Sequence, residues 1–178
     1  MAVHARTYAT TLAVAVRRQA DTHRDVATLG KLIEEIRDDA GRITKEFWIG
    51  LWDIGDDELK RWDAERQWAK NFGAGGDRLE PSIPADDLEA LIAAAAKVKH
   101  YVDKHVAHAD ASAVSASVTL TLDEVHETID VIGELFNKYY GLLTASGWAF
   151  LVPAIQYDWK AVFRVPWIGP GTASARPS

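Results

Sequence analysis

The sequence contains no cysteine, and this absence excludes disulfide bonds and thiolate metal sites. It also has no apolar run near the roughly 20 residues that a membrane-spanning helix needs, so we expect no membrane partner. Acidic residues are absent from the first 20 positions, a composition that organelle transit peptides share. We favour the plainer interpretation, an amino-terminal helix, and expect a cytoplasmic protein.

The formal net charge is −6 over 178 residues, which argues against a protein that coats nucleic acid non-specifically. A local basic cleft stays compatible with this average, because nearby charges dominate the field within a Debye length of about 8–10 Å. The balance of 48% hydrophobic and 26% charged residues is ordinary for one globular domain of this length.

Apolar residues recur at steps of three and four, which predicts α-helices throughout. Thr22 with Asp25 indicates the start of one helix, and Gly41 predicts a break within it. Asp56 is the expected N-cap of the next helix, and Thr121 with Glu124 has the spacing of a capping box. The first of these helices carries a predicted apolar stripe of Leu29, Leu32, Ile33, Ile36, Ile43 and Phe47.

These signals predict an all-α fold, an antiparallel bundle of four to five helices with an irregular aromatic C-terminal extension. We divide the chain into an N-terminal helical segment (1–21), a bundle with a C-terminal strap (22–167) and a flexible tail (168–178). The tryptophans of the first half could form a stacking platform for bases, but core packing is the favoured reading for Trp48, Trp52, Trp62 and Trp68.

Three of the six histidines fall within residues 97–110, KVKHYVDKHVAHAD. Val98, Val102 and Val106 define the core side of this predicted helix, which extends to about residue 110. The opposite side then presents phosphate-binding or acid–base groups, unless it is an ordinary solvated face. The candidate nucleic-acid-binding residues are Lys99, His100, Tyr101, Lys104 and His105, and the candidate catalytic residues are His108, Lys104 and Asp103.

A metal site is the weaker alternative for the same segment. His105 and His108 stand three residues apart, and His126, Glu127 or Asp130 would have to complete the ligand set. No His-Glu-x-x-His pattern is present, so we expect neither a metal nor another cofactor. The adjacent acidic pairs, among them Asp86 and Asp87, are read as helix caps and solvated faces.

The strings YVDKHVAHAD, DEVHETIDVIGELFNKYYGLL and YDWKAVF resemble the HEPN superfamily, and more narrowly its abortive-infection U-type (AbiU-like) branch of anti-phage and toxin–antitoxin systems. The resemblance covers about the second half of the chain. It implies a helical bundle that forms a homodimer, with polar motifs facing each other across a cleft. Active members of the superfamily are metal-independent ribonucleases, so the resemblance implies RNA as a substrate.

The superfamily signature is an arginine separated from a histidine by four to six residues. For His108 the arginine would stand at Tyr101, Val102 or Asp103, and none of these is arginine. The formal spacing does occur for Arg17 or Arg18 with His23, but we expect about one such match by chance in a chain of this composition.

Two main functions therefore stay open, and a third, weaker possibility is a helical interaction domain with no nucleic-acid role. The first is an RNA-directed defence or toxin protein whose ribonuclease motif is degenerate. The second is a non-catalytic HEPN-like module that binds a protein partner, such as a cognate antitoxin, or nucleic acid. The missing arginine shifts weight toward the second, because a lysine replaces the planar two-donor guanidinium only in part.

Overall fold

The protein is seen here in a computed structural model, which describes residues 2–52, 54–73, 76–104 and 119–147. Within these ranges the chain forms helices and no strand, with one isolated antiparallel bridge between Thr44 and Arg78. The predicted all-α fold is confirmed. The helices are α1 (Ala2–Gln19), α2 (Leu29–Asp38), the 3-10 helix η1 (Ala40–Arg42), α3 (Lys45–Gly50), α4 (Glu58–Asn71), α5 (Ser82–Val102) and α6 (Leu122–Thr144).

Helix starts follow local capping chemistry. The capping box is confirmed, since the Thr121 hydroxyl accepts from the backbone N–H of Glu124 at 3.3 Å while the Glu124 side chain accepts from the Thr121 N–H at 2.9 Å. Two other predicted starts are wrong. The cap of α2 is Thr28 rather than Thr22, and the cap of α4 is Asp57 rather than Asp56. In each case the observed cap has extended backbone that aims its side-chain oxygen at the first free N–H groups.

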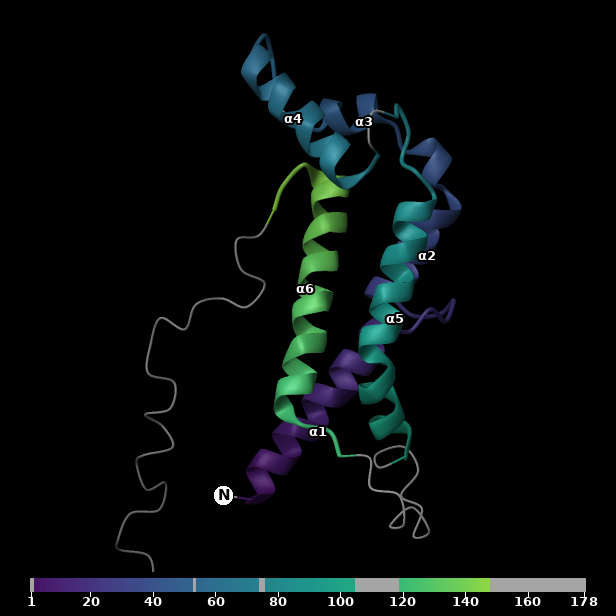
Figure 1. The fold of residues 1–178 in the computed structure, drawn as a ribbon, viewed down its shortest axis with the longest axis vertical. Helices are drawn as coiled ribbons and strands as arrows, with labels where there is room; N and C mark the ends of the chain where they lie inside the picture. Colours follow the sequence, from purple (N-terminus) through teal and green to yellow (C-terminus); the bar gives the residue numbers. More distant parts are fainter. Residues whose placement is uncertain (1, 53, 74–75, 105–118, 148–178) are drawn as a thin grey trace, which may run out of the picture. The chain divides into compact units, whose positions relative to one another are not determined.

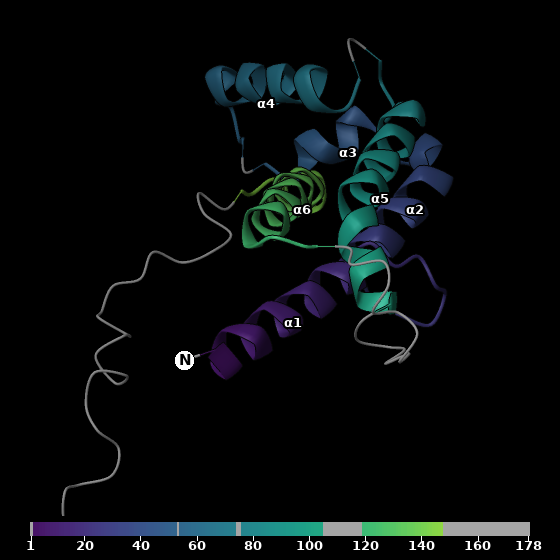
Figure 2. The ribbon, with the colours of Figure 1, turned by 60° about the horizontal axis from the view of Figure 1, so that its bottom comes forward.

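Helices α1, α2 and α6 all pack against α5 (Figures 1 and 2). The predicted core residues Val98 and Val102 are buried, and Leu88, Leu91 and Ala95 continue the same buried side toward the start of the helix. Helices α5 and α6 run in opposite directions, so the last turns of α5 lie near the first turns of α6 (Figure 1). This arrangement brings three chain segments together at the C-terminal end of α5.

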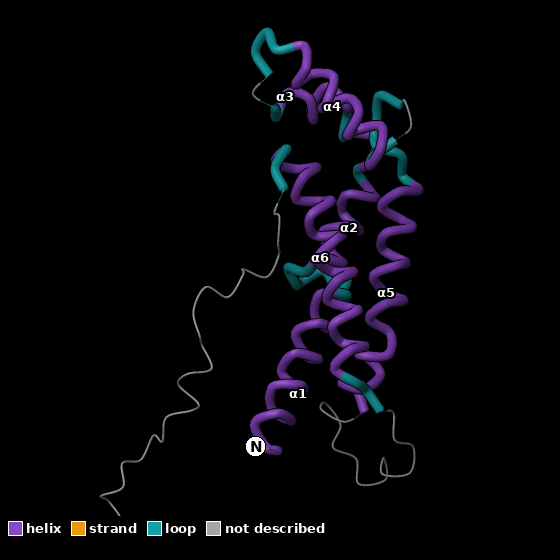
Figure 3. Tube along the Cα trace, turned by 60° about the vertical axis from the view of Figure 1, so that its left-hand side comes forward, coloured by secondary structure: helices purple, strands orange, loops and turns teal. Residues whose placement is uncertain are grey.

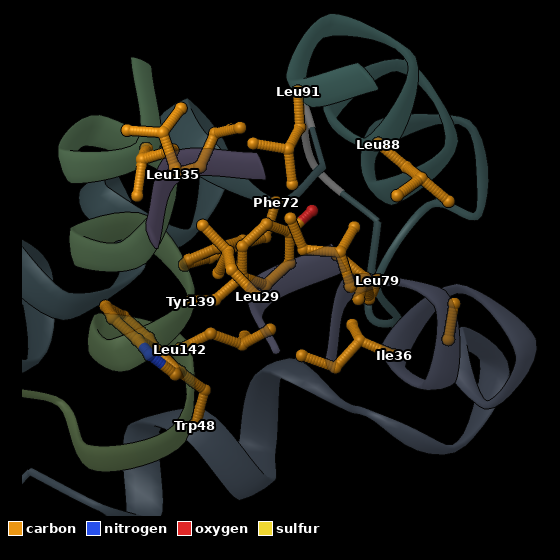
Figure 4. Close-up of a cluster of buried hydrophobic side chains, with 14 of the residues drawn as sticks. Leu29, Ile36, Trp48, Phe72, Leu79, Leu88, Leu91, Leu135, Tyr139 and Leu142 are labelled. Atoms are coloured by element: carbon orange, nitrogen blue, oxygen red, sulfur yellow. The ribbon is translucent and has the colours of Figure 1, made fainter. Parts of the chain in front are cut away.

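Helices α3 and α4 pack on each other near the end of α6 (Figures 1 and 3). The indole of Trp48 donates to the carbonyl oxygen of Gly141 at 3.1 Å, and its ring lies 6.1 Å from Trp68 and 5.9 Å from Phe72. Figure 4 shows Trp48 beside Leu142 of α6 in the buried cluster. The core reading is confirmed for Trp48 and Trp68.

Two apolar residues depart from the predicted core. Phe47 is 51% exposed, and Trp62 is 57% exposed with the Arg66 guanidinium over its ring at 5.0 Å. The predicted stripe ends early because the 3-10 helix around Gly41 interrupts the helix and α3 restarts in a new phase. The break predicted at Gly41 is thereby confirmed, whereas the position of Phe47 on the core face is wrong.

The predicted C-terminal strap and tail fall on residues 148–178, which lie outside the described residues, as do His105 and His108. None of the helices in the described part of the chain is long and apolar enough to cross a membrane.

Candidate functional site

The last turns of α5 separate buried from exposed side chains as the helical spacing predicts. Val98 and Val102 are buried, while Lys99, His100 and Lys104 are exposed. His100 and Lys104 stand four residues apart and therefore share one side of the helix. The structure thus confirms a basic outer side at the end of α5, up to Lys104, the last residue described there.

Tyr101 lies on the flank of this surface. Its side chain is half-buried and packs against the hydrophobic core cluster. A tyrosine in this position has less of its ring available for stacking on a base than an exposed one has. Its assignment to nucleic-acid binding stays a prediction.

Asp103 is held by an arginine from another helix. The Nε of Arg17, near the end of α1, donates to Oδ1 of Asp103 at 2.8 Å, and the two side chains are 36% and 38% exposed. Arg17 reaches this place because its neighbour Val16 and the preceding Ala13 are buried, which fixes the side of α1 that faces the bundle. A guanidinium therefore lies at the end of α5 although α5 itself contains no arginine.

The structure also gives no hydrogen bond or ion pair between Arg17 and His23, the two described residues that have the formal spacing of the superfamily signature. His23 is 65% exposed, and its Nδ1 accepts from the N–H of Asp25 at 3.4 Å and lies 3.7 Å from the Asp25 carboxylate. Arg17 is engaged with Asp103 and His23 with Asp25, so the two members of the formal Arg17–His23 spacing have different partners.

A second charge contact ties α6 to the same region. Glu124, in the first turn of α6, accepts from the Lys97 ammonium and from the backbone N–H of Thr121. These two donors, the lysine first, hold the pKa of Glu124 at about 2, well below its ordinary value. The contact fixes the start of α6 beside the last turns of α5.

A third contact explains the FNKYY string at the end of α6. The carboxylate of Asp87 accepts from the hydroxyl of Tyr139 at 2.7 Å and from the ammonium of Lys138 at 2.6 Å. Tyr139 is fully buried, and burial together with the Asp87 charge raises the pKa of its hydroxyl well above the ordinary range. The string therefore anchors α6 to α5, whereas Asp86, next along the chain, is exposed.

Sequence reasoning missed both Arg17 and Asp87. The reading of Asp87 as a cap or solvated residue is wrong, because its partners lie more than 50 positions away. The spacing of Arg17 and His23 is attributed to chance in the sequence analysis, and that attribution gives Arg17 no role. A usable signal was present, since α1 carries Arg17 and Arg18 in its last turn and no acid among its 18 residues.

Metal ligands do not gather in the described ranges, where no group of three or more histidine, aspartate or glutamate side chains is placed to hold an ion. The arrangement at the end of α5 instead offers cations, of which Arg17 is paired with Asp103 and Lys97 with Glu124. This is the chemistry that binds phosphate oxygens.

Comparison with known families matches residues 3–162 to the model of the AbiU2 family of HEPN proteins. The chain belongs to this family. The match spans nearly the whole chain and includes α1, so the expectation that the resemblance covers only the second half is wrong. Neither a curated protein nor a solved structure matches the chain.

AbiU2 membership gives the protein its class, an abortive-infection type of HEPN protein. The match also makes α1 part of the region that the family shares. The helix that carries Arg17 lies inside the matched region and packs against both α5 and α6.

Proposed function

We propose that this AbiU2 protein acts on RNA through a site at the C-terminal end of α5. The observation that carries the proposal is the gathering of cationic side chains from two helices at this end. Lys99 and His100 of α5 and Lys104, two residues after its end, are exposed, and α1 contributes the guanidinium of Arg17. An acidic chain that concentrates cations in one place has the local field that a polyanion needs.

In the proposed reaction His108 is the acid–base group, since an imidazole titrates near neutral pH. A base removes the proton of a ribose 2′-hydroxyl, and the 2′-oxygen attacks the adjacent phosphorus. The bond from phosphorus to the 5′-oxygen breaks, and that oxygen takes up a proton. The products are a 2′,3′-cyclic phosphate and a 5′-hydroxyl, so the step consumes no metal and no water. Lys104 would contact the phosphate as the negative charge develops.

Binding without cleavage is the second candidate function. One observation favours it, namely that positions 101–103, at the C-terminal end of α5, hold Tyr101, Val102 and Asp103 and no arginine. Losing one preorganised donor to the developing charge commonly costs about 10²–10³ in rate. A protein of this kind would hold RNA or a protein partner, such as a cognate antitoxin, at the same surface.

The test uses the full chain with a labelled single-stranded RNA in the presence of EDTA, and follows binding by fluorescence anisotropy and cleavage on gels. We expect metal-independent cleavage that His108→Ala lowers by about 10²-fold or more. His23→Ala is the control, because that histidine is engaged with Asp25 in the loop after α1. Melting curves verify that each variant is folded.

Each outcome has a defined meaning. Cleavage that survives His108→Ala, or that is lost in His23→Ala instead, would overturn the assignment of the site. Binding without cleavage by the wild-type chain would replace the first function by the second. A wild-type chain that neither binds nor cleaves the RNA would overturn an RNA-directed function.

A further inference from the structure

We infer that Arg17 of α1 is the phosphate-binding guanidinium of the proposed RNA site, and that Asp103, the C-cap residue of α5, is the residue that positions it. The inference rests on the proposed function and adds a residue that does not belong to α5. Its starting point is the 2.8 Å contact between the Nε of Arg17 and Oδ1 of Asp103, which joins positions 86 residues apart.

The contact with Asp103 uses the Nε of Arg17 and leaves the two terminal nitrogens of the guanidinium available to a ligand. Asp103 accepts from Nε, on the side edge of the group. Within the described part of the chain, Nη1 and Nη2 have no hydrogen-bond partner, and 36% of the side chain is exposed. These two nitrogens form the planar end of arginine that binds two phosphate oxygens at once.

Asp103 restrains the group that it binds. A free arginine side chain has several rotatable bonds, and ordering them on binding costs free energy. A carboxylate on the Nε edge fixes the plane of the guanidinium before RNA arrives, so less of that cost falls on the binding step. Asp103 acts in this way through Arg17 and is a positioning residue.

A purely structural role explains the pair less well. Ion pairs that are exposed to this degree contribute little to folding stability. Helix α1 is already attached to the bundle by apolar burial, since Ala13 is fully buried and Val16 is 3% exposed. The Arg17–Asp103 pair therefore contributes little to the stability of the fold. It does supply a cation with two donors for phosphate, which the lysines and the histidine of the proposed site do not have.

The surroundings of the pair also suit a polyanion. Lys99 of α5 and Lys104, two residues after the end of α5, are exposed, and the first 20 residues of the chain contain no acid. Asp103 is the one carboxylate on α5 between Glu89 and the end of its described residues. The start of α6 adds Asp123 and Glu124, and the Glu124 carboxylate is already paired with Lys97.

The experiment measures the affinity of the full chain for a labelled single-stranded RNA over a series of salt concentrations. For Arg17→Ala we expect a loss of about tenfold in affinity, the scale of one charge-assisted hydrogen-bonded contact. The slope of log affinity against log salt should fall by about 0.7, because one phosphate contact is lost. The matched control is Arg18→Ala, an exposed arginine one position along, which should stay close to wild type in both quantities.

Arg17→Lys separates binding from structure. Lysine keeps the charge and the ion pair with Asp103, so the melting temperature should stay close to wild type. It has no second donor edge, so the RNA affinity should fall toward that of Arg17→Ala. This variant keeps the test valid even if Arg17→Ala unfolds.

Two results would overturn the inference while the proposed function stands. One is a wild-type chain that binds RNA while Arg17→Ala and Arg18→Ala change affinity and salt slope equally. The other is an Arg17→Lys variant with wild-type affinity and wild-type slope. Failure of the wild-type chain to bind the RNA at all is a different result, since it removes the proposed function itself.

Discussion

Tyr139 of α6 and Asp87 of α5 form a hydrogen bond of 2.7 Å between a fully buried hydroxyl and a carboxylate that keeps 18% of its side chain exposed. The ammonium of Lys138 reaches the same carboxylate oxygen. Two neighbouring residues of α6 therefore share one acceptor on α5. This contact sets the register between the two longest helices of the bundle, and so it sets which residues meet at the far end of α5.

Removing the acceptor should destabilise the fold. We expect Asp87→Asn to lower the free energy of unfolding by about 1–3 kcal/mol, because the ammonium of Lys138 loses its charged partner and the Tyr139 hydroxyl a strong acceptor. Urea denaturation followed by tryptophan fluorescence measures the change. Asp86→Asn is the control, since Asp86 is exposed, and should alter stability by less than about 0.5 kcal/mol. Equal effects of the two substitutions would contradict the anchoring role of Asp87.

The pKa of Glu124 predicts a specific response to acid. Its folded value of about 2 lies below its ordinary value near 4.5, so the unfolded chain takes up the proton first as pH falls. The stabilisation is therefore complete above about pH 4.5 and is lost as the pH falls toward 2. Glu124→Gln keeps an oxygen for the Thr121 N–H but has no charge for Lys97.

The measurement is the melting temperature of wild type and Glu124→Gln between pH 7 and pH 2. We expect a difference that is constant at neutral pH and shrinks below about pH 4.5. Glu127→Gln, at an exposed position on the same helix, controls for the general effect of removing a carboxylate. A difference between wild type and Glu124→Gln that does not depend on pH would show that the ion pair with Lys97 contributes nothing.

These contacts mark the limit of what the sequence could predict. Helix type and one capping box followed from spacing, because both depend on residues three or four positions apart. The outer side of α5, with His100 and Lys104, followed from the same rule. Such features depend on interactions between residues that are close in sequence, so the sequence alone is enough to predict them.

The rest depends on partners that are distant along the chain. Arg17 meets Asp103 across 86 positions, and Asp87 meets Tyr139 across 52. No periodicity of a single helix encodes which helix lies beside it. For Arg17 the sequence did hold a hint, a helix with basic residues and no acid, but that composition does not identify the residue that the arginine contacts.

Gly30 permits the close approach of α2 to the end of α1. A Cβ at this position would lie 3.1 Å from the carbonyl carbon of Ala20 and from the carbonyl oxygen of Asp21, both of which are backbone atoms. Alanine gains about 1 kcal/mol over glycine in a helix, but overpacking against backbone costs about 1–3 kcal/mol. We therefore expect Gly30→Ala to destabilise the protein, by up to about 2 kcal/mol.

Gly50→Ala is the matched control, because its Cβ would meet nothing within 4 Å at the end of α3. That variant should be neutral or slightly more stable in thermal denaturation. If Gly30→Ala is as stable as Gly50→Ala, the backbone between α1 and α2 can shift to accommodate the added Cβ at little cost in free energy. The position of Arg17 would then depend on the buried face of α1 and not on this junction.

Self-association is the last expectation to test. In the homodimer that the family resemblance implies, the polar motifs of two chains face each other, so we propose that Lys104, which is exposed, lies at or near the interface. Charge reversal by Lys104→Glu places a second acid beside Asp103 and changes the charge pattern that the partner meets. We expect this variant to raise the dissociation constant about tenfold in sedimentation velocity. Lys70→Glu on α4 is the control and should leave it unchanged, and a wild-type chain that stays monomeric at micromolar concentration would contradict the proposed dimer.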